Sequence, residues 1–501
     1  MCLPICEHID DATRRDAIDG IGEHEVEERP VGLPLLDDLS NREVPTTLDL
    51  GRCPWVGGDP FEIAGHTIAR HTSNMGEHIL DRPQRGGRHH PIGVDTARCH
   101  ERDDAFTSGA IEIPRVGGHS ADCSLAAMSD ESPLQPATRA ITAGRAASGA
   151  SLAPALWAST VWESDGMLDA RRRATRTRSA EFYSRYANPT VTSFEDAVAS
   201  LEGAEASLAF ASGMGAVATT VLALCSKGDH IVAQRNLYSA TLAFLQGPCA
   251  RFGIETTFVD ATQPGAFRAA IQPGRTMLVL AETPSNPRLE LADFDELGSL
   301  GGPIVVVDST FATPIGQQPL RHGVHLSLHS ATKGIAGHND ATLGVISGER
   351  DLLDAIWGYS VLHGSTPSPF DALNGLRGIR TLAVRTRQQA ASALAIANML
   401  EQHPAVNAVH YPGLESHPQH ALARRQMQQF GTVLAFDVKG GTDAVNTLLE
   451  KVQLLRVATS LGGPETLVCH PATTTHASLT PEEAVEQGVT PGLVRMSVGL
   501  E

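Results

Sequence analysis

The chain has 501 residues, of which 42% are hydrophobic and 19% are charged, so it can bury a large core and is not a disordered segment. Its 57 acidic residues against 39 lysines and arginines give a net charge of −18, which argues against general nucleic-acid binding because that needs a basic surface. No apolar run approaches the ~18 residues of a membrane span, the N-terminus turns acidic too early for a secretory signal, and eight cysteines are too few for a disulfide scaffold. We therefore expect a soluble protein in a reducing, cytoplasmic setting.

Residues 1–127 differ in composition from the rest of the chain. They contain no lysine, 12 arginines and 23 acidic residues, a net charge of −11, and glycine and proline break their short apolar runs. Cys2, Cys6 and His8 could ligate a metal, but their spacing matches no standard zinc pattern, and incidental thiols are the alternative. We expect an acidic leader with little structure, either a floppy extension or sequence outside the native enzyme, and a natural beginning at Met128.

Residues 128–190 are expected to form an N-terminal arm, after which short β-rich segments alternate with longer helical ones. The segment PIVVVD at 303–308 is uniformly apolar up to its aspartate, which is typical of a strand buried on both faces of a parallel sheet. The alternation predicts a large α/β domain at 191–380 with a mostly parallel sheet. Its strands are expected at 207–211, 230–234, 276–281, 303–308 and 325–329, and two of its helices at 213–224 and 239–252.

The pattern changes after residue 380. A long helix is expected at 381–401, and strands at 432–438 and 493–500 alternate in character. This predicts a smaller α+β domain over residues 381–501.

Three polar features follow strands of the large domain, and ligands bind at the carboxyl ends of the strands in an open parallel sheet. Asp308 ends the apolar strand, and 330–333 (SATK) follows the next one. The segment 212–215 (SGMG) joins a strand to a helix, where glycine allows close backbone approach and free N–H groups can bind phosphate. An ordinary strand–helix turn is the alternative for that segment, and it lacks the third glycine of a dinucleotide-binding motif.

A lysine amine and an aspartate at neighbouring strand ends suit one particular cofactor. A lysine in a cleft can form a Schiff base, and an aspartate facing a pyridinium nitrogen strengthens pyridoxal phosphate as an electron sink. Asp308 could instead cap the turn that follows it. Together with a phosphate cradle, however, Asp308 and Lys333 are the parts that pyridoxal 5'-phosphate requires. The chain offers few other amines, since its lysines are Lys227, Lys333, Lys439 and Lys451.

The chain from about Thr138 to Glu501 resembles the Cys/Met-metabolism (transsulfuration) family of pyridoxal-phosphate enzymes. This family includes cystathionine γ-synthase, cystathionine γ-lyase, methionine γ-lyase and the O-acylhomoserine sulfhydrylases. One departure is Gly334, where the family usually has an aromatic residue. The motifs stand in family order: YSR at 183–185 and NPT at 188–190, LEGAEASLAFASGMGA at 201–216, ETPSNP at 282–287, VVVDSTFATP at 305–314, HSATKGIAGHND at 329–340, RGIRTLAVR at 377–385, HYPGL at 410–414, SLGG at 460–463, HPATTTHAS at 470–478 and LVRMSVGLE at 493–501.

The resemblance implies pyridoxal-phosphate fold type I, which is aspartate-aminotransferase-like, with a large mostly parallel-sheet domain and a smaller C-terminal α+β domain. It implies pyridoxal 5'-phosphate as the cofactor and two catalytic residues, Lys333 as the Schiff-base lysine and proton shuttle, and Tyr238 as the ring-stacking tyrosine. No metal is implied. The implied cofactor-binding residues are Ser212, Gly213, Met214, Asp308, Ser330, Thr332, Tyr183 and Arg185, and the implied substrate-binding residues are Arg495, Ser460 and Asn286.

The resemblance also implies partners. Tyr183 and Arg185 match residues that reach the phosphate of the neighbouring subunit, so a homodimer is the minimum and a homotetramer with shared active sites is the usual assembly. The substrate is implied to be a small amino acid, with no nucleic-acid or membrane partner.

The implied reaction is γ-elimination or γ-replacement on homoserine esters or sulfur amino acids, as in O-acylhomoserine sulfhydrylase and methionine γ-lyase. A cystathionine γ-synthase or γ-lyase is the alternative, but such enzymes commonly carry acidic residues where Phe182 and Thr459 stand here, although Glu181 and Glu465 lie nearby in the sequence. Ala240 replaces a cysteine that methionine γ-lyases often have. A catalytically silent assembly or regulatory protein is a further alternative, which the complete set of catalytic positions argues against.

Overall fold

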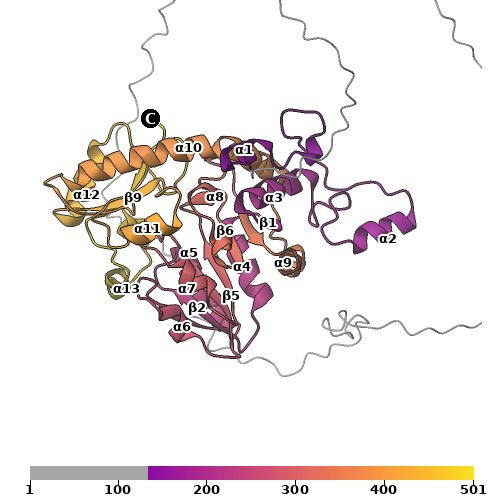
Figure 1. The fold of residues 1–501 in the computed structure, drawn as a ribbon, viewed down its shortest axis with the longest axis horizontal. Coiled ribbons are helices and arrows are strands. Elements are labelled where there is room, and N and C mark those ends of the chain that lie inside the picture. Colours follow the sequence, from indigo (N-terminus) through magenta and orange to yellow (C-terminus); the bar gives the residue numbers. More distant parts are fainter. Residues whose placement is uncertain (1–133) are drawn as a thin grey trace, which may run out of the picture. The chain divides into compact units, whose positions relative to one another are not determined.

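The structure is a computed structural model, and it describes residues 134–501. The leader expected at 1–127, its cysteine and histidine cluster and the beginning expected at Met128 all lie outside the described residues. The described part contains two β-sheets with helices packed against them (Figure 1). None of its helices combines the length and the apolar character that a membrane span requires.

The larger sheet has seven strands in the order β1-β7-β6-β5-β4-β2-β3. β2, β3, β4, β5 and β6 pair in parallel, whereas β7 is antiparallel to both of its neighbours. The predicted mostly parallel sheet is therefore confirmed. The strands are β1 (Ala206–Phe210), β2 (His230–Gln234), β3 (Glu255–Val259), β4 (Thr276–Glu282), β5 (Ile304–Asp308), β6 (Leu326–His329) and β7 (Gly344–Gly348).

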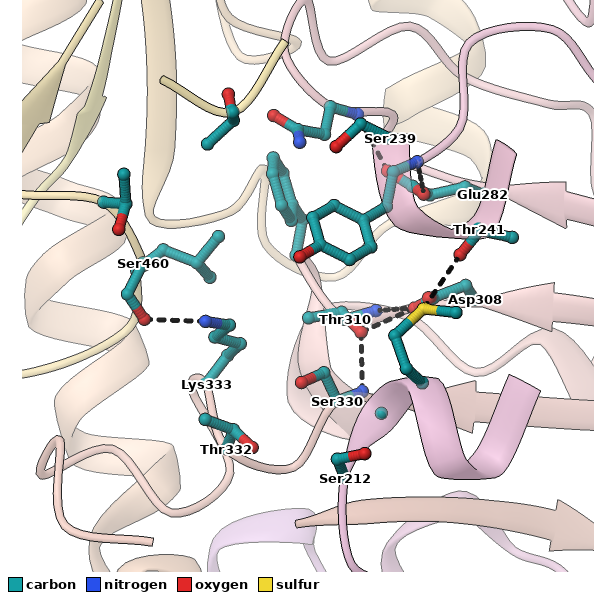
Figure 2. A pocket seen from close by; sticks show the side chains of 18 of the residues that line it. Ser212, Ser239, Thr241, Glu282, Asp308, Thr310, Ser330, Thr332, Lys333 and Ser460 are labelled. Carbon is teal, nitrogen blue, oxygen red and sulfur yellow. Dashed lines mark hydrogen bonds between the residues drawn. The ribbon is translucent and has the colours of Figure 1, made fainter. Parts of the chain in front are cut away.

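The parallel strands of this sheet end at the pocket drawn in Figure 2, because polar residues at the carboxyl ends of β4, β5 and β6 line it. Helices cover both faces of the sheet. α4 (Gly213–Leu224) and α9 (Arg350–His363) pack together on one face, and α3 (Pro189–Glu202) contacts β1 and β7. The pocket therefore lies at one edge of a sheet whose two faces are already covered.

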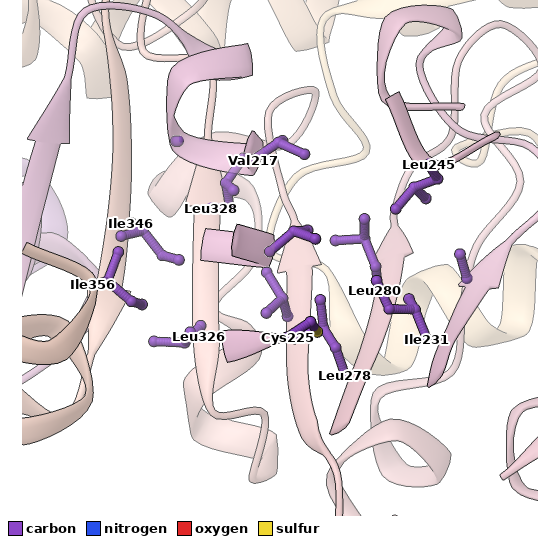
Figure 3. Close-up of a cluster of buried hydrophobic side chains, with 14 of the residues drawn as sticks. Val217, Cys225, Ile231, Leu245, Leu278, Leu280, Leu326, Leu328, Ile346 and Ile356 are labelled. Atoms are coloured by element: carbon purple, nitrogen blue, oxygen red, sulfur yellow. The ribbon is translucent and has the colours of Figure 1, made fainter. Parts of the chain in front are cut away.

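The side chains of β5 explain why the PIVVVD segment is uniformly apolar. Val306 packs with Leu280 and Leu328 in the cluster under α4 and α9 (Figure 3), whereas Val305 and Val307 pack in a second cluster on the opposite face. All three valines are at most 1% exposed. The strand is thus buried on both faces, as its sequence predicts.

The smaller sheet has the order β10-β11-β12-β9-β8 and is antiparallel except for the β10–β11 pair. α10 (Pro369–Glu401) contacts α3 of the larger layer as well as β8 and β9 of the smaller one (Figure 1). The strands are β8 (Val406–His410), β9 (Val433–Val438), β10 (Arg456–Val457), β11 (Leu467–Cys469) and β12 (Leu493–Ser497).

Two predicted helices differ from the observed ones. The helix expected at 381–401 begins at Pro369, because Ser368 accepts a hydrogen bond from the Phe370 N–H and caps it there. It therefore crosses residue 380, and the domain limits 191–380 and 381–501 stay a prediction. The helix expected at 239–252 changes to π geometry at Leu245–Cys249, around Pro248, which has no N–H to donate.

The remaining helices connect these layers. They are α1 (Pro136–Thr142), α2 (Met167–Thr175), α5 (Ser239–Phe244), α6 (Ala266–Ala270), α7 (Phe294–Gly298), α8 (Thr313–Gly316), α11 (His420–Gln426), α12 (Gly441–Lys451) and α13 (Pro481–Glu486).

Candidate active site

A cavity of about 810 Å³ lies at the carboxyl ends of the large-sheet strands (Figure 2). Residues that come from segments far apart in the sequence meet there. Eleven of the thirteen site residues predicted from the sequence line it, and Tyr183 and Arg185 do not. The eleven are Ser212, Gly213, Met214, Tyr238, Asn286, Asp308, Ser330, Thr332, Lys333, Ser460 and Arg495.

One end of the cavity is the N-terminus of α4. Ser212 caps the helix, and its side chain accepts a hydrogen bond from the Gly215 N–H. The N–H groups of Gly213 and Met214 lie in the first turn and have no intrahelical acceptor. A Cβ on Gly213 would lie 2.7 Å from the Cβ of Ser330, so only glycine lets these segments approach. This end can bind an anion through neutral donors.

The two hydroxyls of the SATK segment behave differently. The Thr332 hydroxyl donates to the Leu343 carbonyl and accepts from the Leu343 N–H, so it ties the segment to the residue just before β7. The Ser330 hydroxyl faces Gly213 and makes no hydrogen bond within residues 134–501. The hydroxyl of Ser330 is therefore available to a ligand phosphate, whereas the hydroxyl of Thr332 is occupied in holding the segment that carries Lys333.

Asp308 lies partly buried at the end of β5. Its carboxylate accepts hydrogen bonds from the Thr310 N–H at 3.0 Å and from the Thr310 hydroxyl. Burial raises the pKa of Asp308 above its usual value, and the two bonds from Thr310 oppose that rise. The turn-capping alternative and a role in the cavity thus hold together, because one carboxylate oxygen caps the turn while the side chain lines the cavity.

Lys333 is the only one of the four lysines that lines the cavity. Its Nζ donates to the Ser460 hydroxyl at 2.7 Å (Figure 2). Burial lowers the pKa of Lys333 below its usual value, and the positive charge of Arg495 lowers it further. Ser460 is held at φ +79°, a conformation that costs a non-glycine residue free energy and that is found at functional sites.

Arg495 lies in the middle of β12 and is 3% exposed, so it is a buried arginine and not a surface one. Its guanidinium donates to the Asn286 side-chain oxygen at 2.9 Å and to the Ser460 carbonyl at 3.0 Å. Both partners are neutral, so the positive charge is available to an anionic ligand. This arrangement suits a carboxylate, whose two oxygens match the guanidinium fork.

Tyr238 lies at the start of α5, lines the cavity together with Lys333 and is 42% exposed. The ring therefore has an open face on the cavity side. Its backbone N–H donates at 2.7 Å to Glu282, a residue to which the sequence assigned no role.

Tyr183 and Arg185 lie in the arm, away from the cavity of their own chain. Arg185 donates to the Val361 carbonyl at 2.7 Å, and its guanidinium carbon lies 5.4 Å from the ring centres of Tyr183 and Tyr186. Arg185 is exposed. Neither Tyr183 nor Arg185 therefore lines the cavity of its own chain.

Two further residues near the cavity were missed at the sequence level. Glu282 ends β4 as Asp308 ends β5, and the register pairs the two positions. Arg385 is 4% exposed on α10 and donates to the carbonyls of Gly334 and Ile335, directly after Lys333. Glu282 could have been predicted from the sequence, because it ends a strand in the same way as Asp308, which was selected for that reason.

Gly334 is accommodated by close packing. A Cβ on Gly462 would lie 2.5 Å from the Gly334 nitrogen, and a Cβ on Gly334 would lie 2.8 Å from the Thr313 methyl group. The departure from the family pattern is therefore local to the contact of this loop with Gly462 and Thr313.

The lining fits pyridoxal phosphate in its chemistry. Neutral donors at the start of α4 suit its phosphate, the Asp308 carboxylate suits its ring nitrogen, and the Lys333 amine suits its aldehyde. The close approach of Gly213 to Ser330 is the cradle that a Cβ would fill. Among residues 134–501, no group of three or more histidines, cysteines and acidic residues is placed to hold a metal ion.

Comparisons with known proteins agree with this geometry. The family model described as Cys/Met metabolism PLP-dependent enzyme matches residues 137–501. O-succinylhomoserine sulfhydrylase of Pseudomonas aeruginosa is 42% identical over 66% of this chain and 83% of its own length, and L-methionine γ-lyase of Treponema denticola is 40% identical over 70% and 89%. The crystal structure of cystathionine γ-synthase from Xanthomonas oryzae pv. oryzae with aminoacrylate and cysteine has a TM-score of 0.69 at 36% identity, covering 74% of this chain and 95% of that one.

Proposed function

Because the chain belongs to the Cys/Met metabolism family of pyridoxal-phosphate-dependent enzymes, we propose that it catalyses γ-elimination or γ-replacement on a homoserine ester or a sulfur amino acid. The enzyme uses pyridoxal 5'-phosphate. The observation that carries the proposal is the cavity itself, where Lys333, Asp308 and Arg495 meet beside the helix N-terminus of α4. A cystathionine γ-synthase or γ-lyase activity remains the second candidate, because solved structures of a cystathionine γ-synthase share the fold.

In the proposed mechanism the cofactor, when bound, supplies an aldehyde for the amino group and a ring that withdraws electrons from the substrate Cα. The residues of this chain bind and orient the substrate around it. Arg495 binds the substrate α-carboxylate through its guanidinium, which Asn286 and the Ser460 carbonyl hold in place. Asp308 would hold the ring nitrogen of the cofactor, and its negative charge would favour the protonated, cationic form of that nitrogen.

Proton transfers are assigned to Lys333 and Tyr238. The lowered pKa of Lys333 increases its neutral fraction near pH 7, and a neutral amine can accept a proton. Ser460, which accepts a hydrogen bond from Nζ, orients the amine in the cavity. A γ-reaction needs a base and then an acid at neighbouring carbons, and Lys333 and Tyr238 both line the cavity.

The test is chemical labelling of the lysine. Borohydride reduction of the yellow purified protein, followed by peptide mapping, is expected to place the reduced cofactor on Lys333. Lys227 lies in a turn and Lys439 and Lys451 lie outside the cavity, so they serve as internal controls. A label on any of those three would contradict the assignment.

We propose that cystathionine and cysteine are poorer substrates than a homoserine ester, methionine or homocysteine. Thr459 lines the cavity where a cystathionine enzyme commonly has an acid, and Phe182 packs edge-on against Tyr186. Glu465 does not line the cavity and accepts a hydrogen bond from Asn339 at 2.8 Å. At the positions of Phe182, Thr459 and Glu465 the cavity therefore offers no carboxylate to a distal ammonium group, which would need one once desolvated.

Comparing kcat/KM across O-acetylhomoserine, O-succinylhomoserine, methionine, homocysteine and cystathionine tests this preference. Product analysis with and without added sulfide separates replacement from elimination. A clear preference for cystathionine, or for cysteine as the incoming thiol, would overturn it.

We also propose a homodimer as the minimum assembly and a homotetramer as the expected one. The phosphate end of the cavity offers neutral donors, while a phosphate dianion favours an arginine. Arg185 is exposed and lies outside its own cavity, so it is available to a second copy.

Subunit complementation tests the shared site. The variants Arg185→Ala and Lys333→Ala are each expected to be inactive alone. Mixed under conditions that exchange subunits, they should recover roughly a quarter of the wild-type activity, because half the random dimers then contain one complete site. No recovery in proven mixed dimers would contradict a shared site.

Finally, we propose that the enzyme acts in the cytoplasm. Cys225, Cys249 and Cys469 are buried free thiols, which suits a reducing compartment. Cell fractionation with an antibody against the protein is the test.

A further inference from the structure

Glu282 is a buried acid that the mechanism above does not use. It ends β4 beside Asp308 of β5, lines the cavity and is 5% exposed. A buried carboxylate costs free energy unless hydrogen bonds compensate for the loss of water, so the presence of an acid at this position requires an explanation.

Two backbone N–H groups converge on this carboxylate. One oxygen accepts from Tyr238 at 2.7 Å and the other accepts from Asn286 at 2.8 Å. A carboxylate offers acceptors only, whereas the isosteric amide of glutamine offers one acceptor and one donor group. In a glutamine at this position, the side-chain NH₂ group would face the backbone N–H of either Tyr238 or Asn286, and two donors cannot form a hydrogen bond with each other. The geometry therefore requires a glutamate.

The two N–H groups belong to residues that serve opposite parts of the proposed active site. Tyr238 precedes α5 without a side-chain cap, and its ring is 42% exposed. Asn286 accepts the hydrogen bond of Arg495 through its side-chain oxygen. Arg495 in turn donates to the carbonyl of Ser460, whose hydroxyl accepts from Lys333. Through its two oxygens, Glu282 thus connects the backbone of Tyr238 to Asn286, the residue that holds Arg495.

We propose that Glu282 is a positioning residue for the reaction, whose carboxylate holds Tyr238 at the cofactor site and, through Asn286, holds Arg495 at the substrate site. The inference rests on the proposed function, from which the roles of Tyr238 and Arg495 come. It predicts that one side chain controls both the binding of substrate and the rate of its conversion.

The charge of Glu282 gives an independent readout. Asp308 from β5 and Arg495 from β12 are the charged groups that face it, and Lys333 lies across the cavity. Burial raises the pKa of Glu282 and the charge of Asp308 adds to the rise, whereas the two N–H bonds and Arg495 oppose it and favour the ionised form. Removing an anion destabilises nearby cationic groups. The visible absorbance of the Lys333-bound cofactor should therefore titrate at lower pH in a neutral variant.

The experiment compares Glu282→Gln with Glu195→Gln in the full-length, cofactor-loaded enzyme. Glu195 is also a buried glutamate, 8% exposed, but it lies on α3 outside the cavity lining and accepts a single backbone N–H, from Ala209 at 2.8 Å. An amide oxygen can still accept that one bond. Glu282→Asp serves as the second variant, since it keeps the charge but is one methylene too short to hold both N–H groups.

Glu282→Gln is expected to raise KM and lower kcat, with kcat/KM falling roughly a hundredfold, and to lower the pH of the absorbance titration. Glu282→Asp should lower kcat/KM with a smaller shift of that pH. Glu195→Gln should stay within about twofold of wild type in all three quantities. Circular dichroism and cofactor content establish that each variant is folded and loaded.

The inference is overturned if Glu282→Gln matches Glu195→Gln in KM, kcat and titration pH. It is also overturned if both Glu282 variants fail to fold while Glu195→Gln folds, since Glu282 would then be a purely structural residue. A wild-type enzyme without γ-activity would instead contradict the proposed function. The failure of the proposed function can therefore be told apart from the failure of the inference about Glu282.

Discussion

At the scale of single residues, Arg495 is the buried group that we propose binds the substrate carboxylate. Its guanidinium is oriented by Asn286 and by the Ser460 carbonyl. Arg495→Lys keeps the charge but loses the two-pronged geometry, so we expect KM for the amino acid to rise roughly a hundredfold while the absorbance of the bound cofactor is unchanged. Arg456→Lys, at an exposed position on β10 of the same sheet, is the matched control. An unchanged KM in Arg495→Lys would refute the carboxylate role.

Gly213 permits a close approach to Ser330 at the end of the cavity that we propose binds phosphate. In Gly213→Ala the new methyl group would meet the Cβ of Ser330 at 2.7 Å, and neither backbone can move freely. We expect the dissociation constant of pyridoxal phosphate to rise about tenfold or more. Gly358→Ala is the control, because a Cβ there meets nothing within 4 Å inside helix α9, and it should stabilise the fold by about 0.5 to 1 kcal/mol. Equal cofactor affinity in both variants would count against the cradle.

At the scale of elements, the packing of α3 against β1 contains a pH-sensitive contact. Glu195 of α3 accepts the Ala209 N–H, and burial raises its pKa from 4.5 to about 7, against the opposing charge of Arg178. A carboxyl whose folded-state pKa is raised contributes stability that is complete below the unfolded value, near pH 4.5, and is lost as pH rises through about 7.

The expected consequence is measurable by urea unfolding between pH 4.5 and 8. The wild-type free energy of unfolding should fall relative to that of Glu195→Gln by about 3 kcal/mol over this range, since the amide does not titrate. Parallel curves for the two proteins would show that Glu195 keeps its ordinary pKa.

At the scale of the whole molecule, the described residues hold both sheets and the 22 residues that line the cavity in one chain. We expect a chain that begins at Met128 to keep the cofactor and to keep kcat/KM within about twofold, because no lining residue is removed. Visible absorbance and steady-state kinetics are the measurements. A chain that begins at Val191 also lacks Tyr183 and Arg185, and we expect it to lose activity. An insoluble or colourless protein from the chain that begins at Met128 would show that residues 1–127 are needed.

The sequence alone was sufficient for the features that local patterns encode. The alternation of strands and helices predicted a mostly parallel sheet, and the position of Asp308 and Lys333 after successive strands predicted that they would meet at one edge. Both follow from local geometry, because parallel strands end on the same side of their sheet. Helix α10 was recognised only from residue 381, because Gly375 and Gly378 weaken the helix propensity of its first 12 residues although their buried positions follow a helical spacing.

Only the tertiary structure decided which atoms pair. The Tyr238 N–H reaches Glu282 across 44 residues of sequence, and Arg495 reaches Asn286 across 209. Thr332 is occupied by Leu343 while Ser330 faces the cradle, although both are hydroxyls in one motif. Residue type states how many hydrogen bonds a group can make, and strand order states roughly where it lies. The partner depends on the packing of loops from both sheets, which no local pattern contains.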